Sequence, residues 1–302
     1  QEDQEDQEDQ EDQEDQEDQE DQEDHTPPMS KPLTEAQLRF KAMEKKESHR
    51  LLQQFRSRSK SNMYKKMLHQ RQRLPAYQMA EDIMRQIDYA QVVVVSGETG
   101  CGKTTQLPQI VMDALMLRGQ GATCNMICTQ PRRISAIGVA ERVASERAES
   151  IGQTVGYQIR LESKRSRETR LLFCTTGVLL RRLQCDSSLK GVSHIFVDEI
   201  HERDLNTDFL LIILKDLIRA RPTLKLILMS ATLNAQMFAE YFGEKGGDTC
   251  PIIEIPGRTF NVTAYMLEDA LEATGHVIDA SSDCARRDGG KPKKGGGGRG
   301  GG

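Results

Sequence analysis

The 302-residue chain contains no tryptophan, and only 5% of its residues are aromatic. No apolar run approaches the roughly 20 residues needed to cross a bilayer, so no membrane partner is expected. No secretory signal is visible, because the N-terminus is acidic rather than cationic and then apolar. The seven cysteines are scattered, and no second Cys/His pair is spaced to complete a zinc site. We therefore expect a reducing compartment, the nucleus or the cytoplasm, and core positions for Cys124 and Cys128.

The two ends of the chain lack the apolar side chains that would offset the entropy lost on folding. Residues 1–24 are eight repeats of Gln-Glu-Asp, and the chain from about Asp288 to Gly302 is mostly Gly, Lys and Arg. We expect disordered termini, with an acidic tail over residues 1–32 and a Gly/Lys/Arg-rich tail over residues 269–302. About 240 residues remain, which is enough for one large domain with a flanking element.

The net charge of −5 is misleading, because the repeats carry 16 of the 46 acidic residues. Residues 25–302 hold 41 basic and 30 acidic side chains, a formal net charge of +11. A basic body suits a polyanionic partner such as nucleic acid. From charge alone, a solvated basic surface is an equally good interpretation.

Residues 33–70 are rich in Lys, Arg, Gln, Glu, Leu and Met, with apolar residues irregularly at helical spacing. This composition predicts a basic helical extension. Its most basic part, Arg56–Lys66, is either an arm that contacts phosphates or a solvated helical surface. We favour the arm because of the motifs that follow it.

After Pro75, short apolar runs alternate with amphipathic segments of helical length. The runs predict buried strands over Gln91–Ser96, Ala122–Thr129, Arg170–Cys174, Ser193–Val197 and Leu224–Met229. The other segments predict helices at about Thr104–Leu117, Ser135–Glu146, Val178–Leu183, Leu205–Arg219 and Ala235–Phe242. This alternation predicts an α/β fold in which helices cover both faces of a parallel sheet. Ligands of such sheets bind at the carboxyl ends of the strands.

The first predicted strand leads into GETGCGKTT, residues 97–105, which fits the phosphate-binding pattern G-x-x-x-x-G-K-[ST]. Its glycines let the backbone approach phosphate oxygens, and the following helix points the positive end of its dipole at them. Lys103 would neutralise phosphate charge, and Thr104 would offer its hydroxyl to Mg²⁺. The predicted nucleoside triphosphate site consists of Gly97, Glu98, Thr99, Gly100, Cys101, Gly102, Lys103, Thr104 and Thr105.

The fourth predicted strand ends in VDEIHER, residues 197–203. An acidic residue after a buried strand is what a P-loop NTPase needs to hold Mg²⁺. Asp198 would hold the ion, and Glu199 would polarise the attacking water. His201 would link this site to a neighbouring motif. The predicted catalytic residues are Lys103, Asp198, Glu199 and His201, and the predicted metal-site residues are Thr104, Asp198 and Glu199.

Three further motifs follow predicted strands. SAT, which ends the fifth strand, would lie beside the acidic pair and relay hydrogen bonds from it; its residues are Ser230, Ala231 and Thr232. TQPRRISA places Arg132 and Arg133 where they could pair with nucleic-acid phosphates, or else form a surface pair or an internal salt bridge. TTG offers Thr175 and Thr176 to a phosphate, or is a plain helix cap.

In order and spacing, GETGCGKT, TQPRRISA, CTTG, DEIH and SAT resemble motifs I, Ia, Ib, II and III of DEAH-box superfamily 2 RNA helicases. The wider sequence, about residues 71–269, is similar to the DEAH/RHA branch and its G-quadruplex-resolving subgroup. The resemblance implies a RecA-like ATP-binding domain over residues 71–268. It implies ATP, Mg²⁺ and RNA, including structured or G-quadruplex nucleic acid, as ligands. It further implies that Arg142 stacks on the nucleotide base and that Arg133 and Thr175 touch the RNA backbone.

The family motor has two RecA-like lobes, and the second lobe supplies arginine fingers in a QRxGRAGR-like stretch that this sequence lacks. An arginine finger is worth about 10³–10⁵ in rate, so we expect the ATP-binding lobe of an RNA helicase, weak as an NTP hydrolase alone. One alternative is a truncated RNA- or partner-binding module without productive hydrolysis. Another is a different P-loop NTPase, such as a kinase, against which the motif after the second strand and the DEIH–SAT pair argue. Oligomeric state has no signal in the sequence.

Overall fold

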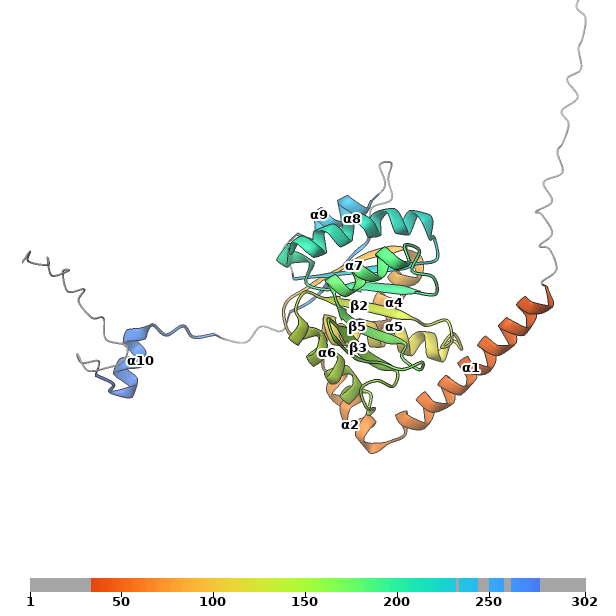
Figure 1. Cartoon of the computed structure of the whole chain (residues 1–302). Coiled ribbons are helices and arrows are strands. Elements are labelled where there is room, and N and C mark those ends of the chain that lie inside the picture. Colours follow the sequence, from red (N-terminus) through yellow and green to blue (C-terminus); the bar gives the residue numbers. More distant parts are fainter. Residues whose placement is uncertain (1–33, 232–233, 244–249, 258–261, 278–302) are drawn as a thin grey trace, which may run out of the picture.

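The computed structural model describes residues 34–231, 234–243, 250–257 and 262–277 (Figure 1). The acidic tail predicted over residues 1–32 lies outside the described residues. So do Thr232 and the part of the predicted C-terminal tail beyond residue 277.

An eight-stranded sheet forms the centre of the molecule, with the strand order β4-β3-β5-β2-β6-β7-β1-β8. All neighbouring strands are parallel except the antiparallel pair β3–β4. The predicted α/β class with a parallel sheet is therefore confirmed. The strands are β1 (Val92–Gly97), β2 (Met126–Gln130), β3 (Val155–Ile159), β4 (Glu162–Lys164), β5 (Leu171–Thr175), β6 (His194–Val197), β7 (Lys225–Ser230) and β8 (Ile252–Ile255).

Helices cover both faces of the sheet, as predicted (Figure 1). Val93 and Val95 of β1 pack against one helical layer, and Val92 and Val94 pack against the other. This alternation follows from the period of two in a strand. The first layer contains α1 (Glu35–Ser59), α3 (Pro75–Gln78), α4 (Ala80–Tyr89), α5 (Lys103–Leu117) and α6 (Arg133–Glu146), and the second contains α7 (Thr176–Cys185), α8 (Leu205–Ala220) and α9 (Ala235–Phe242).

The N-terminal extension forms two helices rather than one. The chain breaks after α1, and α2 (Asn62–Arg71) starts after Ser61, whose hydroxyl accepts a hydrogen bond from the Tyr64 N–H. The second half of α1 packs on the domain through the buried Leu51, while its first half projects from the body (Figure 1). Within Arg56–Lys66, Arg58 forms an ion pair with Glu149. The arm interpretation is therefore wrong for Arg58, which binds the domain instead.

The sequence prediction missed three strands and one long helix. β3, β4 and β8 were not predicted, and neither was α4, although its buried Ile83, Met84 and Ile87 have helical spacing. β2 begins at Met126, four residues later than predicted. A further helix, α10 (Leu267–Thr274), has no buried residue and spans the predicted boundary at residue 268. Cys124 and Cys128 lie in the core, as predicted. None of the described helices is both long and apolar enough to span a membrane.

Candidate functional site

The glycine-rich loop connects β1 to α5 at the carboxyl edge of the sheet. Gly100 and Gly102 have φ angles of 86° and 98°, in the left-handed region that glycine adopts without strain. Gly97 is required for another reason, since an added Cβ would lie 2.9 Å from the Ile255 carbonyl oxygen. The buried Lys103 ammonium donates to the carbonyl oxygens of Gly97 and Glu98. The predicted P-loop is thus built as a turn that holds its lysine at its centre.

A cleft of about 310 Å³ lies over this loop. It brings residues of the loop together with Arg142 from α6, Glu199 after β6 and Ala231 after β7. A larger hollow of about 620 Å³, lined by Ser61 of the α1–α2 break and Glu141 of α6, contains neither the loop nor the acidic pair. We therefore place the functional site in the smaller cleft.

Asp198 lies directly after β6, and its side chain is buried. Its carboxylate accepts hydrogen bonds from Gln130 Nε2 at 2.7 Å and from the Glu199 N–H at 2.9 Å. Burial raises the pKa of Asp198, although these hydrogen bonds and the nearby Thr104 hydroxyl act to lower it. A buried carboxylate with a costly charge is stabilised by a nearby cation. Thr104 and Asp198 together offer the oxygen donors that Mg²⁺ prefers, so they fit that ion.

Glu199 follows Asp198 with a φ of 54° and lines the same cleft. Burial and the neighbouring Asp198 charge both raise the pKa of Glu199. A carboxylate with a raised pKa is a better proton acceptor, which suits a general base. Among the described residues, no three His, Cys, Asp or Glu side chains form a metal-holding group.

His201 lies on the short helix η1 (Ile200–Glu202), between the acidic pair and the end of β7. Its Nδ1 accepts a hydrogen bond from the Ala231 N–H at 3.1 Å. Glu199 Oε2 is also 3.4 Å from this nitrogen. The backbone N–H of Ala231 can only donate, so Nδ1 of His201 accepts this hydrogen bond and carries no proton. Nδ1 therefore cannot donate to Glu199, and its hydrogen bond is the one from Ala231. Ser230 is fully buried at the end of β7, opposite Ser96 of β1.

The residues predicted to bind nucleic acid lie at the carboxyl edge of the sheet. Arg132 and Arg133 come shortly after Gln130, the last residue of β2. Gln130 is the register partner of Thr175, the last residue of β5. Arg133 is exposed at the start of α6. Arg132 is exposed too, but its guanidinium donates to Glu202 Oε1 at 3.0 Å, which is the salt-bridge alternative. Thr175 is half-buried. Thr176 is buried, with its Oγ1 3.5 Å from that of Thr207.

Sequence reasoning missed Gln130 and Glu146. Gln130 ends β2 inside a motif that the sequence had singled out, so its place beside Asp198 followed from the pairing of β2 with β6. Glu146 lines the cleft from the end of α6, and a lone glutamate near a helix end carries no comparable signal.

A glycine-rich loop between a strand and a helix, with an acidic pair on a nearby parallel strand, defines a P-loop NTPase of RecA-like architecture. Residues 67–240 match the model of the DEAD/DEAH box helicase family, and the chain belongs to this family. The resemblance to DEAH helicases that its motifs indicated is confirmed.

Three relatives illustrate the similarity. The human putative ATP-dependent RNA helicase DHX57 is 55% identical over 240 residues, which are 80% of this chain and 17% of the relative. DExH-box ATP-dependent RNA helicase DExH3 of Arabidopsis thaliana is 61% identical over 213 residues, 70% of this chain and 17% of the relative. Human ATP-dependent DNA/RNA helicase DHX36 is 52% identical over 231 residues, 76% of this chain and 22% of the relative. The chain thus matches about a fifth of each relative's length.

Proposed function

We propose that this chain is the ATP-binding lobe of an ATP-dependent RNA helicase, which couples ATP hydrolysis to RNA binding and unwinding when a second lobe is present. One observation carries the proposal. Thr104, Asp198 and Glu199 come from two segments far apart in the sequence, and the fold joins them at one glycine-rich loop. Such a grouping serves hydrolysis of a phosphoanhydride bond.

Each residue has a chemical task in this proposal. Lys103 binds the phosphates and neutralises their charge. Thr104 and Asp198 hold Mg²⁺, which when bound supplies positive charge to the phosphate oxygens. Glu199 orients the attacking water and accepts its proton, and its raised pKa improves it as a base. His201 accepts a hydrogen bond from the Ala231 N–H after β7. A movement of the acidic pair is transmitted through this bond to Ser230–Thr232.

RNA is the proposed partner, held along its phosphates by Arg133 and Thr175. Two relatives named above are called RNA helicases, and the third a DNA/RNA helicase. The resemblance to the quadruplex-resolving subgroup makes a folded G-rich RNA the substrate to compare with a plain single strand. A nuclear or cytoplasmic location is supported by six free cysteines among the described residues, five of them buried.

The test is ATP hydrolysis with and without RNA, on the wild type, Lys103→Ala and Glu199→Gln. We expect slow hydrolysis that RNA stimulates, because a lobe without an arginine finger lacks about 10³–10⁵ in rate. Lys103→Ala should lose ATP binding. Glu199→Gln should keep ATP binding and lose about 10²-fold or more in hydrolysis. Hydrolysis that both variants leave unchanged would refute the proposed roles.

A further inference from the structure

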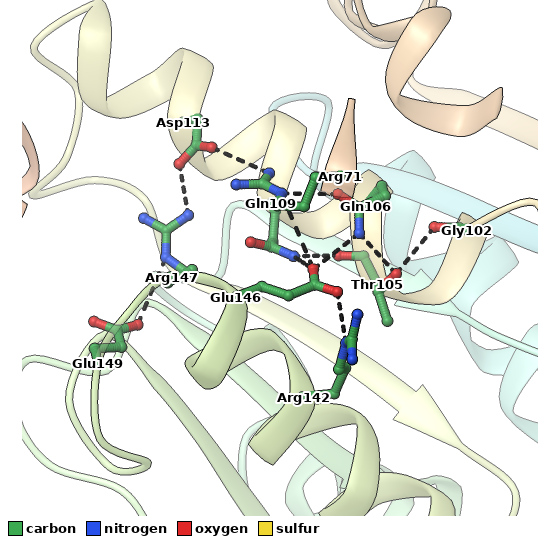
Figure 2. Close-up of polar contacts among 10 residues, drawn as sticks. All are labelled: Arg71, Gly102, Thr105, Gln106, Gln109, Asp113, Arg142, Glu146, Arg147 and Glu149. Carbon is green, nitrogen blue, oxygen red and sulfur yellow. Dashed lines mark hydrogen bonds and ion pairs between the residues drawn. The ribbon is translucent and has the colours of Figure 1, made fainter. Parts of the chain in front are cut away.

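Beside the nucleotide cleft lies a buried polar cluster that joins α2, α5 and α6 (Figure 2). At its centre is Glu146, whose side chain is 2% exposed. Its Oε1 accepts from Arg142 Nε at 2.7 Å, and its Oε2 accepts from the amides of Gln106 and Gln109 at 2.9 and 2.7 Å. Because both oxygens are bonded to different elements, the carboxylate is held in one orientation. Glu146 therefore holds the Arg142 guanidinium in a defined place.

Arg142 is the part of this cluster that reaches the cleft. Its side chain is 54% exposed and lines the cleft with the loop residues. The hydrogen bond to Glu146 limits the rotamers of a long side chain that solvent would otherwise leave free, and this preorganisation favours binding. The resemblance to DEAH helicases implies that Arg142, which lines the cleft with the loop residues, meets the base of the nucleotide. A planar guanidinium can stack on a planar base.

The cluster extends to the N-terminal helices through Arg71, the last residue of α2, which is 1% exposed. Arg71 Nε donates to Gln106 Oε1 at 2.9 Å. A guanidinium can only donate, so Gln106 must turn its oxygen to Arg71 and its NH₂ group to Glu146. Arg71 thus sets the orientation of the amide that holds Glu146.

The same amide also reaches the glycine-rich loop. Gln106 Nε2 has two N–H groups, and the second donates to Thr105 Oγ1 at 2.9 Å. The Thr105 hydroxyl in turn lies 3.4 Å from the Gly102 carbonyl oxygen. Figure 2 shows both branches leaving Gln106, one toward Arg142 and one toward the loop.

We infer that Glu146 and Arg71 are positioning residues for the nucleotide, and that α2 of the N-terminal extension is part of the nucleotide site. Arg71 orients Gln106, Gln106 and Gln109 hold Glu146, and Glu146 holds Arg142 against the base. The inference rests on the proposed function, because it takes the ligand of the cleft to be a nucleotide.

A double-mutant cycle on the 302-residue chain tests the inference. Dissociation constants are measured for Mg²⁺–ADP and for inorganic tripolyphosphate, with Glu146→Gln, Arg142→Ala and the double variant. Glu146→Gln should weaken ADP binding about three- to tenfold, and should add nothing once Arg142 is removed. Tripolyphosphate, which has no base, should bind all variants alike. An equal loss with tripolyphosphate, or an undiminished effect of Glu146→Gln in the Arg142→Ala background, would overturn the inference.

Arg71 has a matched control in Arg147. Both arginine side chains are 1% exposed and both contact Asp113, but Arg147 makes no hydrogen bond to Gln106 among the described residues. Arg71→Lys should weaken ADP binding to the same extent as Glu146→Gln, whereas Arg147→Lys should lower the melting temperature only. If Arg71→Lys and Arg147→Lys weaken ADP binding equally, Arg71 stabilises the fold and does not position the nucleotide. If Arg71→Lys does not fold, the Glu146→Gln cycle decides.

The proposed function can fail separately from this inference. If the wild type and Lys103→Ala bind ADP equally, the nucleotide site itself is wrong. If Lys103→Ala loses binding but the cycle is additive, only the positioning roles fail.

Discussion

The backbone N–H of Ala231 donates a hydrogen bond to Nδ1 of His201, with 3.1 Å between the two nitrogens. This bond joins the end of β7 to the short helix that follows the acidic pair. It also leaves the proton of the neutral ring on Nε2, because Nδ1 accepts. A displacement of either segment must therefore break the bond or carry the other segment with it.

Replacing His201 should loosen the chain after β7. In His201→Ala the Ala231 N–H loses its acceptor, worth about 1 kcal/mol, so the amide should exchange with solvent about fivefold faster. Hydrogen–deuterium exchange of the peptide containing Ala231 measures this change. His201→Asn is the control, because its side-chain oxygen can lie near the place of Nδ1. Unchanged exchange in His201→Ala would show that the bond does not hold the segment.

Neutralising Asp198 should stabilise the ligand-free chain. Burial raises the pKa of Asp198 above its ordinary 3.8, so the folded chain binds a proton at Asp198 more tightly than the unfolded chain does. Stability is therefore lost as pH rises from 3.8 through the raised pKa of the folded chain. At pH 7, Asp198→Asn should raise the melting temperature by about 2–4 °C, equivalent to about 1 kcal/mol. It should also remove the Mg²⁺ dependence of nucleotide binding.

Asp88 is the control for this prediction, because the hydrogen bond from Arg118 lowers its pKa. Asp88→Asn should therefore not stabilise the chain. A lower melting temperature in Asp198→Asn would contradict the prediction.

His194 should make the chain sensitive to acid. Burial, and then the nearby Lys225 charge, lower the pKa of His194 to about 4 from an ordinary 6.5. As pH falls, His194 is protonated in the unfolded chain before it is protonated in the folded chain. The contribution of neutral His194 to stability is therefore fully present above about pH 6.5 and decreases as pH drops toward 4, by at most ~3 kcal/mol. Urea unfolding between pH 7.5 and 4.5 should show a shallower loss in His194→Gln. Replacing the exposed His49 by Gln should leave the dependence of stability on pH unchanged. The same dependence on pH in the wild type and in His194→Gln would refute the role of His194.

Two glycines should respond to alanine in opposite directions. At Gly97 the new Cβ would lie 2.9 Å from the Ile255 carbonyl oxygen and 3.1 Å from Cys101 Sγ, so overpacking should cost about 1–3 kcal/mol. At Gly138, inside α6, the Cβ would meet nothing within 4 Å, so Gly138→Ala should stabilise by about 0.5–1 kcal/mol. Urea unfolding measures both. Loss of stability in Gly138→Ala would show that α6 has a constraint that its packing does not reveal.

The central strands could be predicted from the sequence because they are continuous apolar runs, such as Val92–Val95, that both helical layers bury. The strands that were missed lack this signal. β3 mixes Gly156 and Gln158 with apolar residues, β4 is exposed throughout, and β8 is a four-residue edge strand. Their pairing depends on long-range contacts that local sequence does not encode.

The loop and the acidic pair could be predicted because each follows a recognisable strand, and parallel strands bring their carboxyl ends to one edge. The cluster around Glu146 could not. Arg71 and Gln106 are 35 residues apart, and each looks like an ordinary polar residue of a surface helix. Only the packing of α2 on α6 and of α6 on α5 buries them together, and a charge inside the fold then needs partners.

We propose that the loop from Gly97 to Thr104, together with Asp198, binds ATP with Mg²⁺. Calorimetric titration of the 302-residue chain with ATP, in Mg²⁺ and in EDTA, measures this binding. We predict measurable binding in Mg²⁺, weaker binding in EDTA, and at least about a tenfold loss in Lys103→Ala, since charge-assisted contacts to phosphate are the strong ones. Equal ATP affinity of the wild type and Lys103→Ala, with no dependence on Mg²⁺, would contradict the account.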